Sequence, residues 1–106
     1  MTPEQQRIKI AEACGWKRHP LQMNKNFWIH FPSEKQARDD SDLPDYLNDL
    51  NAMHDVEIDY IIPNGLWDDY VTHLKNLMKD GKRFWGQATA GQRAEAFLRT
   101  LNLWKE

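Results

Sequence analysis

The fold of this chain is decided by its C-terminal stretch, ATAGQRAEAFLRTL at residues 88–101. Thr89 and Gln92 have the spacing of a capping box, in which each side chain bonds the backbone N–H of the other residue. Apolar residues then recur at helical spacing and form a single stripe, made of Ala90, Ala94, Phe97, Leu98, Leu101 and Trp104. The stretch therefore predicts an amphipathic helix whose apolar stripe must be covered by other elements.

A second amphipathic helix is predicted just before it, between Asn64, which can cap it, and Gly81, which ends it. Asp68 and Asp69 fall in its first turn, where negative charge stabilises the helix dipole. Its apolar stripe contains Trp67, Tyr70, Val71, Leu74, Leu77 and Met78. Because two such stripes can cover each other, we expect the core to include Trp67, Tyr70, Leu74, Phe97, Leu98 and Leu101.

The N-terminal part predicts a helix followed by a β-hairpin. The helix should cover about residues 3–14, because Thr2 can cap it, Pro3 suits its first position and Gly15 suits a left-handed end. From residue 16 to 31 aromatic and β-branched residues dominate, around a turn-prone segment at residues 24–26. Alternation of apolar residues from Phe27 to Phe31 predicts a strand with one apolar face.

The middle of the chain predicts a loop at residues 33–42 and a helix from Leu43 to about Glu57. On this helix the apolar side chains gather on one side and aspartates on the other. An extended stretch should then lead to Pro63, and a short strand is expected at residues 82–88. His54 falls in the apolar arc, which predicts a buried histidine.

The order of these elements predicts an α+β fold in a single domain over residues 1–106. We expect a small layered helix/sheet/helix sandwich with about four helices and a short antiparallel sheet of about three strands. The strands are too few for a doubly wound sheet. Hydrophobic residues make up 41% and charged residues 28% of the chain, which argues against disorder.

The same composition indicates an intracellular, soluble protein. Cys14 is the only cysteine, so no disulfide framework can form, and no run of residues is apolar enough to cross a membrane. The first residues lack the charged and apolar regions of a signal peptide. We therefore expect no membrane partner.

Charge is segmented along the chain although the net charge is only −2. Residues 1–38 and 71–106 each carry +4, whereas residues 39–70 carry ten acidic residues and no Lys or Arg. Five aspartates fall on the polar side of the predicted middle helix, namely Asp42, Asp45, Asp49, Asp55 and Asp59. This acidic face has three interpretations: a solvated surface, a mimic of the nucleic-acid backbone, or a docking face for a protein with a basic surface.

Two segments resemble a known family. Residues 45–54, DYLNDLNAMH, and residues 88–101 followed by Trp104 are similar to the phage ABA sandwich domain, and residues 10–16 are also typical of that group. These are small phage and prophage proteins of unknown function, with helix, sheet and helix layers. The resemblance implies a bacterial or phage origin, the cytoplasm of a bacterial cell and the layered fold. It implies no catalytic residues.

Motifs for catalysis or cofactor binding are not evident. Neither His54 with its acidic neighbours nor Asp69 with His73 has a known metal-ligand spacing, so no metal or cofactor is expected. Cys14 lies on the apolar row of the first helix, which favours burial. Ser33 lies outside any nucleophile motif. Catalytic residues are therefore not predicted, and enzymatic activity ranks third among the functions considered.

The leading hypothesis is a non-enzymatic phage or prophage accessory protein that binds a host or phage protein through the acidic face. The alternative is a binder of a small ligand or nucleotide, with a pocket between sheet and helix lined by Trp28, His30, Arg83 and Trp85. Basic and aromatic residues together are also typical of nucleic-acid binders, but the net negative charge makes a nucleic-acid partner unlikely.

Overall fold

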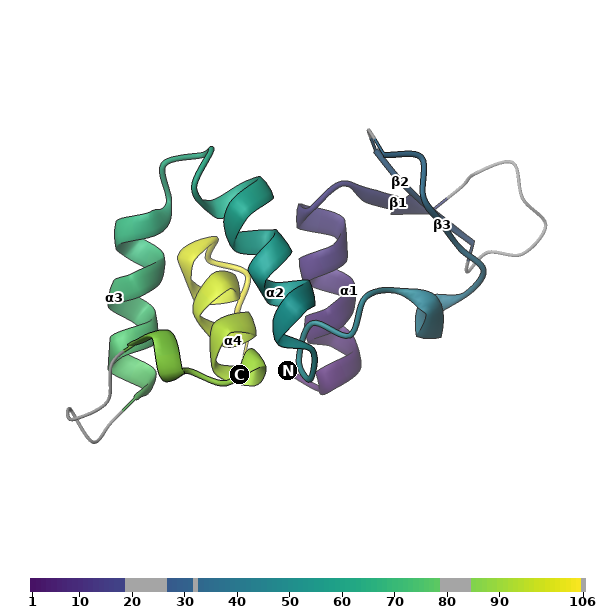
Figure 1. Cartoon of the computed structure of the whole chain (residues 1–106). Coiled ribbons are helices and arrows are strands. Elements are labelled where there is room, and N and C mark those ends of the chain that lie inside the picture. Colours follow the sequence, from purple (N-terminus) through teal and green to yellow (C-terminus); the bar gives the residue numbers. More distant parts are fainter. Residues whose placement is uncertain (19–26, 32, 79–84, 106) are drawn as a thin grey trace.

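The computed structural model describes residues 1–18, 27–31, 33–78 and 85–105 (Figure 1). In these ranges the chain forms four α-helices and one antiparallel sheet of three strands, which confirms the predicted α+β class. The helices are α1 (Pro3–Ala13), α2 (Leu50–Val56), α3 (Trp67–Leu77) and α4 (Ala90–Thr100). The strands are β1 (Trp16–Arg18), β2 (Trp28–His30) and β3 (Gln36–Ala37).

Helix α4 is the element that the other helices share. It packs against α1, α2 and α3. Its predicted capping box is confirmed, because Thr89 N donates to Gln92 Oε1 at 2.9 Å and Gln92 N donates to Thr89 Oγ1 at 3.1 Å. The apolar stripe that follows this cap is therefore held in register with three partners.

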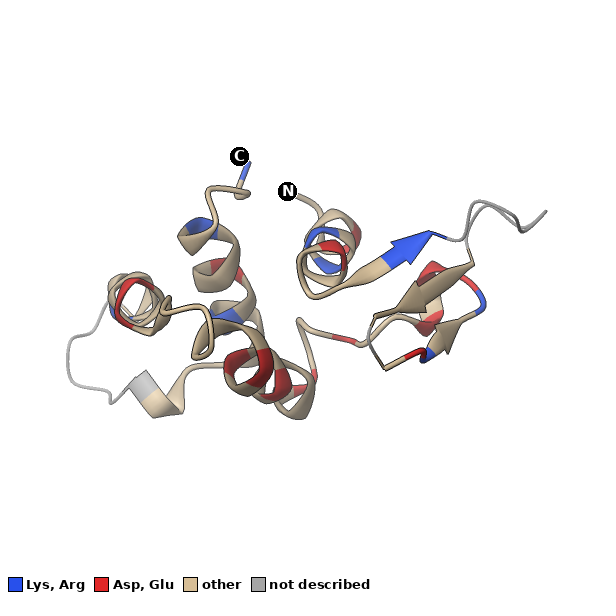
Figure 2. Ribbon diagram, turned by 90° about the horizontal axis from the view of Figure 1, so that it is seen from above, with Lys and Arg blue, Asp and Glu red and all other residues tan. Residues whose placement is uncertain are grey.

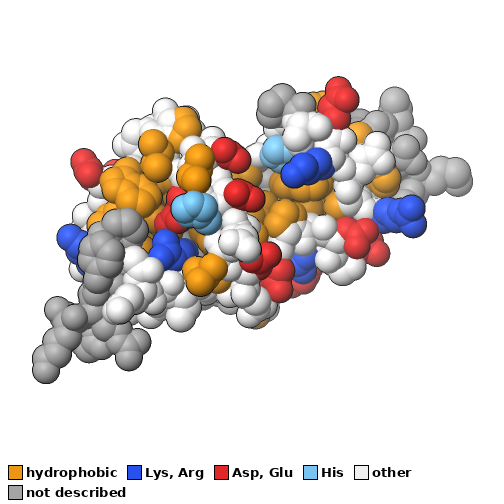
Figure 3. All heavy atoms as spheres, viewed as in Figure 1, with side chains coloured by type: hydrophobic (Ala, Val, Ile, Leu, Met, Phe, Trp, Pro, Cys, Tyr) orange, Lys and Arg blue, Asp and Glu red, His pale blue; other side chains and the backbone are white. Residues whose placement is uncertain are grey.

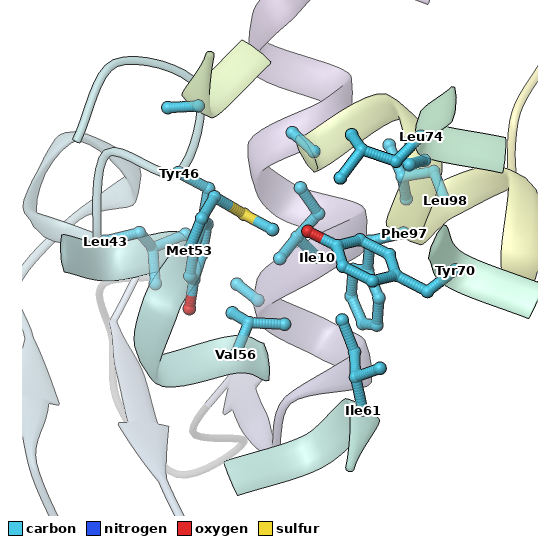
Figure 4. Packing of buried hydrophobic residues seen from close by; sticks show 14 of the residues in the cluster. Ile10, Leu43, Tyr46, Met53, Val56, Ile61, Tyr70, Leu74, Phe97 and Leu98 are labelled. Carbon is cyan, nitrogen blue, oxygen red and sulfur yellow. The ribbon is translucent and has the colours of Figure 1, made fainter. Parts of the chain in front are cut away.

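The core lies where the four helices meet (Figure 4). Tyr70, Leu74, Phe97 and Leu98 are fully buried, while Trp67 and Leu101 pack against them half-buried, which confirms the predicted core. Burying such a side chain fully contributes about 1.5–3 kcal/mol each. Other fully buried side chains come from α1, α2 and the turn after α2, namely Ile10, Met53 and Ile61.

Helix α1 begins and ends as predicted. Thr2 and Gln5 form a capping box, and Gly15 follows the helix with a φ of +101°. A Cβ at Gly15 would lie 2.6 Å from the carbonyl oxygen of Phe31, so glycine is needed both for the backbone conformation and for the close approach of β2. The predicted hairpin turn at residues 24–26 lies outside the described residues.

The buried face of β2 differs from the prediction. Trp28 is 1% exposed, whereas Phe31 is 50% exposed. Trp28 pairs with Arg18 on β1 and with Ala37 on β3. Its Nε1 donates to Asp40 Oδ1 at 2.7 Å, and the Arg18 guanidinium lies 4.3 Å from the centre of its ring. The large indole is buried in preference to the smaller rings because these neighbours satisfy its N–H.

Strand β3 lies inside the segment predicted to be a loop. The pairs Ile29–Gln36 and Trp28–Ala37 use backbone groups of β2, so the polar side chains around them do not prevent pairing. Ala37 is buried because its small side chain fits beside Trp28. A 3₁₀ turn, η1 (Asp40–Asp42), follows directly.

Helix α2 starts seven residues later than the predicted Leu43. Leu43 precedes Pro44 and is extended, with φ −62° and ψ 151°, because a proline disfavours the helical conformation of the residue before it. Asp45 then accepts from the Asn48 side chain, and Asp49 accepts from Asn51 N at 2.9 Å as the N-cap of α2. These local bonds give turns in place of the first helical turns.

Beyond α2 the chain stays helical where an extended stretch was predicted. The π-helical turn η2 (Glu57–Ile61) continues α2, with Ile62 N donating to Glu57 O at 3.0 Å. Glu57 and Ile61 are both buried, although the sequence alternates like a strand. The helix persists because Glu57 has partners in the core, described below.

The third sheet strand predicted at residues 82–88 is wrong in its described part. Residues 85–87 form a 3₁₀ turn, η3 (Trp85–Gln87), and residues 82–84 lie outside the described residues. Asn64 does not cap α3, because its side chain donates to Tyr60 O at 2.7 Å and so closes the end of η2. Leu66 precedes α3 without a side-chain cap.

The sheet lies beside α1 at one end of the molecule, and α3 with η3 lies at the other (Figure 1). The termini are adjacent, since the N-terminal amine donates to Lys105 O at 2.8 Å. Residues of α2 and η2 line one pocket together with residues of β1 and β2. Each helix of the described residues is too short or too polar to span a membrane.

Candidate functional site

A cleft of about 420 Å³ separates the sheet from α2 and η2. Figure 3 shows it as a hollow with hydrophobic side chains at its floor, acidic side chains towards the helices and basic ones towards the sheet. Clefts of this volume are within the range that holds small ligands or a few side chains of a partner protein.

The helical wall is acidic. It contains Asp49, the N-cap of α2, and Asp55 and Asp59, which lie one turn apart on α2 and η2. All three are exposed at the surface, and Figure 2 shows acidic positions along this part of the chain. Within the described ranges, the side chains of Asp55 and Asp59 form no hydrogen bond or ion pair. Their charges are therefore available to a ligand.

The opposite wall comes from the sheet and carries Lys35 and His30. The imidazole is held on both sides: Nε2 lies 2.9 Å from the carbonyl oxygen of Cys14, and Nδ1 contacts Ser33 Oγ. Since a carbonyl can only accept, Nε2 donates, and Nδ1 of the neutral ring accepts from Ser33. In this orientation the imidazole also packs against Trp16, with ring centres 5.1 Å apart and the ring planes tilted by 48°.

The floor of the cleft is aromatic and apolar. Tyr46 and Trp16 are buried there, and Tyr60 is half-buried. Burial raises the pKa of the Tyr46 hydroxyl above its ordinary value, and the Cys14 thiol beside it adds to this effect. The pKa of Cys14 is itself raised to about 12, first by burial and then by the negative charge of Asp59. Both groups are therefore neutral at pH 7, and the floor offers ring faces without competing charge.

Three carboxylates against one ammonium give this cleft a negative potential. Cations bind well where carboxylates and aromatic rings converge, because the rings attract positive charge through their faces. An anion such as a phosphate would be repelled by the helical wall. The arrangement therefore favours amines and guanidinium groups as ligands.

The five predicted aspartates do not lie on one helix face. Of the five, Asp55 and Asp59 share the continuous α2–η2 helix, because residues 43–49 are not helical. Asp49 joins them at the cleft as the cap. Asp45 lies in the preceding turn and lines a separate shallow pocket beside α1, and Asp42 ends η1, where it accepts from Arg38 N at 3.1 Å.

The structure does not bring the alternative pocket residues together. Trp28 is buried within the sheet, while η3, which contains Trp85, lies at the opposite end of the molecule (Figure 1). Arg83 lies outside the described residues. Among the lining residues that the structure describes, His30 is the one member of this set, so a pocket between sheet and helix is present with other residues.

His54 is not the buried histidine that the sequence predicted. Its side chain is 65% exposed, and Nδ1 lies 3.6 Å from Glu57 Oε1. The prediction assumed a helix from Leu43, and the later start and the π turn change which residues face the core. Met53 and Val56 point inward instead.

Glu57 is the only acidic residue that is buried in the described part of the chain. Its Oε2 accepts from Arg93 Nη1 and from Tyr70 Oη, each at 2.7 Å. Arg93 also donates to the carbonyl oxygens of Gly86 and Ala88. This network joins η2, α3, α4 and η3, and it is saturated, so we assign it a structural role.

Metal ligands do not converge in the described ranges: no group of three or more His, Cys, Asp or Glu side chains is arranged to hold an ion. The sequence analysis missed Trp16, Lys35, Tyr46 and Tyr60 at the cleft. No sequence pattern links them, because they meet only through the packing of β1 and the β2–β3 turn against the segment around α2.

Comparison with protein-family models, curated proteins and solved structures finds no match for this chain. The resemblance to the phage ABA sandwich domain therefore stays a prediction.

Proposed function

We propose that this protein is a non-enzymatic binding module that takes a lysine- or arginine-rich segment of a partner protein at the acidic cleft. The observation that carries the proposal is the placement of Asp49, Asp55 and Asp59 together on one wall of a 420 Å³ cleft. The phage or prophage origin and the bacterial cytoplasm belong to the same proposal, with a host or phage protein as the partner.

The electrostatics favour association with a basic segment. Asp55 and Asp59 have no intramolecular partner among the described residues, so folding gains little from their charge. Exposed carboxylates of this kind act mainly by accelerating encounter and by orienting the partner. The aromatic floor can then hold the aliphatic and cationic parts of a lysine or arginine side chain.

Binding of an oligolysine peptide, measured by titration calorimetry at two salt concentrations, tests this function. The double variant Asp55→Asn, Asp59→Asn should bind about three- to tenfold more weakly and with less salt dependence. The matched control is Asp68→Asn, Asp69→Asn, which removes the same charge from the exposed first turn of α3. Equal losses of affinity in both double variants would mean that the peptide responds to the overall negative charge and not to the cleft.

A second candidate is a small cationic ligand, and the aromatic floor favours it. The volume suits a compact amine, and Tyr60, which is half-buried, lines the cleft together with the edges of Trp16 and Tyr46. A nucleotide, considered from the sequence, fits poorly because its phosphates would face carboxylates. Titration with tetramethylammonium distinguishes the candidates: tight binding of this ion alone would favour the small ligand over a peptide.

A further inference from the structure

An exposed apolar row runs beside the acidic wall. Leu50, Ile58 and Ile62 are 52%, 49% and 54% exposed. In the described ranges the only other large hydrophobic side chain of comparable exposure is Phe31, at the end of β2. Exposed apolar side chains are common singly, but a group of three on one element indicates a contact surface.

The spacing places these side chains in one line. Leu50, His54, Ile58 and Ile62 follow one another at intervals of four residues along α2 and η2. Four residues overshoot one turn of an α-helix by about 40°, and the wider π turn, which rotates less per residue, offsets this drift before Ile62. The row extends for roughly 18 Å, which is the length of about three helical turns.

The acidic residues form the neighbouring row. Asp59 follows Ile58 by one residue, and Asp55 follows His54, which lies between Leu50 and Ile58 on the same side. One residue is a rotation of about 100° around the helix. Figure 3 shows hydrophobic and acidic side chains next to each other on this face of the helices. A partner that covers the apolar row therefore also meets the carboxylates.

From this juxtaposition we infer that the partner segment is a basic amphipathic helix, with its apolar side on Leu50, Ile58 and Ile62 and its lysines or arginines towards Asp55 and Asp59. This inference rests on the proposed function and specifies the partner. Charge complementarity selects the occupant, because a second copy would bring the same carboxylates together and an anionic lipid surface would be repelled.

The test uses an amphipathic helical peptide of leucine and lysine and a scrambled peptide of the same composition. The wild-type protein should bind the amphipathic peptide at least about tenfold more tightly than the scrambled one. The variant Ile58→Ser, Ile62→Ser should lose most of this preference. The control Phe31→Ser, which removes an equally exposed apolar side chain elsewhere, should keep it.

The outcomes separate the two proposals. Equal binding of both peptides, abolished by Asp55→Asn, Asp59→Asn, would support the acidic cleft and overturn the amphipathic helix. Absence of binding to either peptide would overturn both. A preference for the amphipathic peptide that survives in Ile58→Ser, Ile62→Ser would place the contact elsewhere, and dimerisation lost in that variant would assign the row to a second copy. Each of these results would overturn this inference.

Discussion

Glu57 and Arg93 form an ion pair inside the core, with Oε2 and Nη1 2.7 Å apart and with side chains that are 5% and 10% exposed. The pair joins η2 to α4, and Glu57 and Arg93 themselves are 36 residues apart in sequence. The Tyr70 hydroxyl completes the pair, and its pKa is raised by burial and by the neighbouring Glu57 carboxylate. The helices on which the cleft depends are therefore held by a buried charge network as well as by apolar packing.

Removing one charge of this pair should be strongly destabilising. Glu57→Gln leaves the Arg93 guanidinium buried without a counter-charge, at a cost of about 3–5 kcal/mol in the free energy of unfolding. Glu12→Gln removes one partner of the exposed pair with Lys9 and should cost less than about 1 kcal/mol. Urea denaturation measures both, and similar losses in the two variants would contradict a special role for the buried pair.

Identical truncations should distinguish the core from the exposed row. Leu74→Ala removes a fully buried side chain and should destabilise by about 2–5 kcal/mol, because a cavity is left among the helices. Leu50→Ala changes a half-exposed side chain and should cost less than about 1 kcal/mol. A denaturation midpoint unchanged by Leu74→Ala would mean that Leu74 does not belong to the core.

Asp49 should have separable structural and binding roles. As the N-cap of α2 it accepts from Asn51 N, and asparagine caps almost as well. Asp49→Asn should therefore keep stability while it weakens binding of a basic peptide, whereas Asp49→Ala should also lose about 0.5–2 kcal/mol. Thermal melts beside peptide titrations of both variants provide the check, and equal stability of the two would mean that the cap contributes nothing.

The Cys14 thiol should react slowly in the folded protein. Its pKa of about 12 lies above the ordinary value of 9.0, so at pH 8 the folded thiolate is about a thousandfold less populated than the unfolded one. Because the folded state favours the protonated thiol, this contribution to stability is present below pH 9 and is lost as the pH rises towards 12. Thiol modification with and without urea measures the ratio, and equal rates would contradict the raised pKa of this half-buried thiol.

The sequence predicted the parts of this fold that local signals determine. Capping boxes at Thr2 and Thr89 and the stripe through Phe97 placed α1 and α4, because caps and periodicity depend on near neighbours. The start of α2 was missed although Pro44 was visible, since the amphipathic pattern was extended through it. The π turn depends on Glu57 meeting Arg93, a contact between distant residues that the local pattern does not contain.

Of the candidate site, the sequence predicted the acidic residues but not the cleft. The aspartates of residues 39–70 were recognised as a possible docking face, and three of them line the cleft. The opposite wall of the cleft was not predicted. Lys35 and Trp16 become neighbours of the aspartates only when β1 and the β2–β3 turn pack near α2. A sequence shows how charge is distributed along the chain, but it does not show the tertiary packing that forms the cleft.

Binding of a basic segment at the cleft can be followed by the amide chemical shifts of the ¹⁵N-labelled protein during titration with an oligolysine peptide. We expect the amides of Asp49, Asp55, Asp59 and Lys35 to shift together and to saturate with a single binding constant. Shifts that concentrate instead around Asp68 and Asp69 on α3, or that spread evenly over acidic residues, would contradict it.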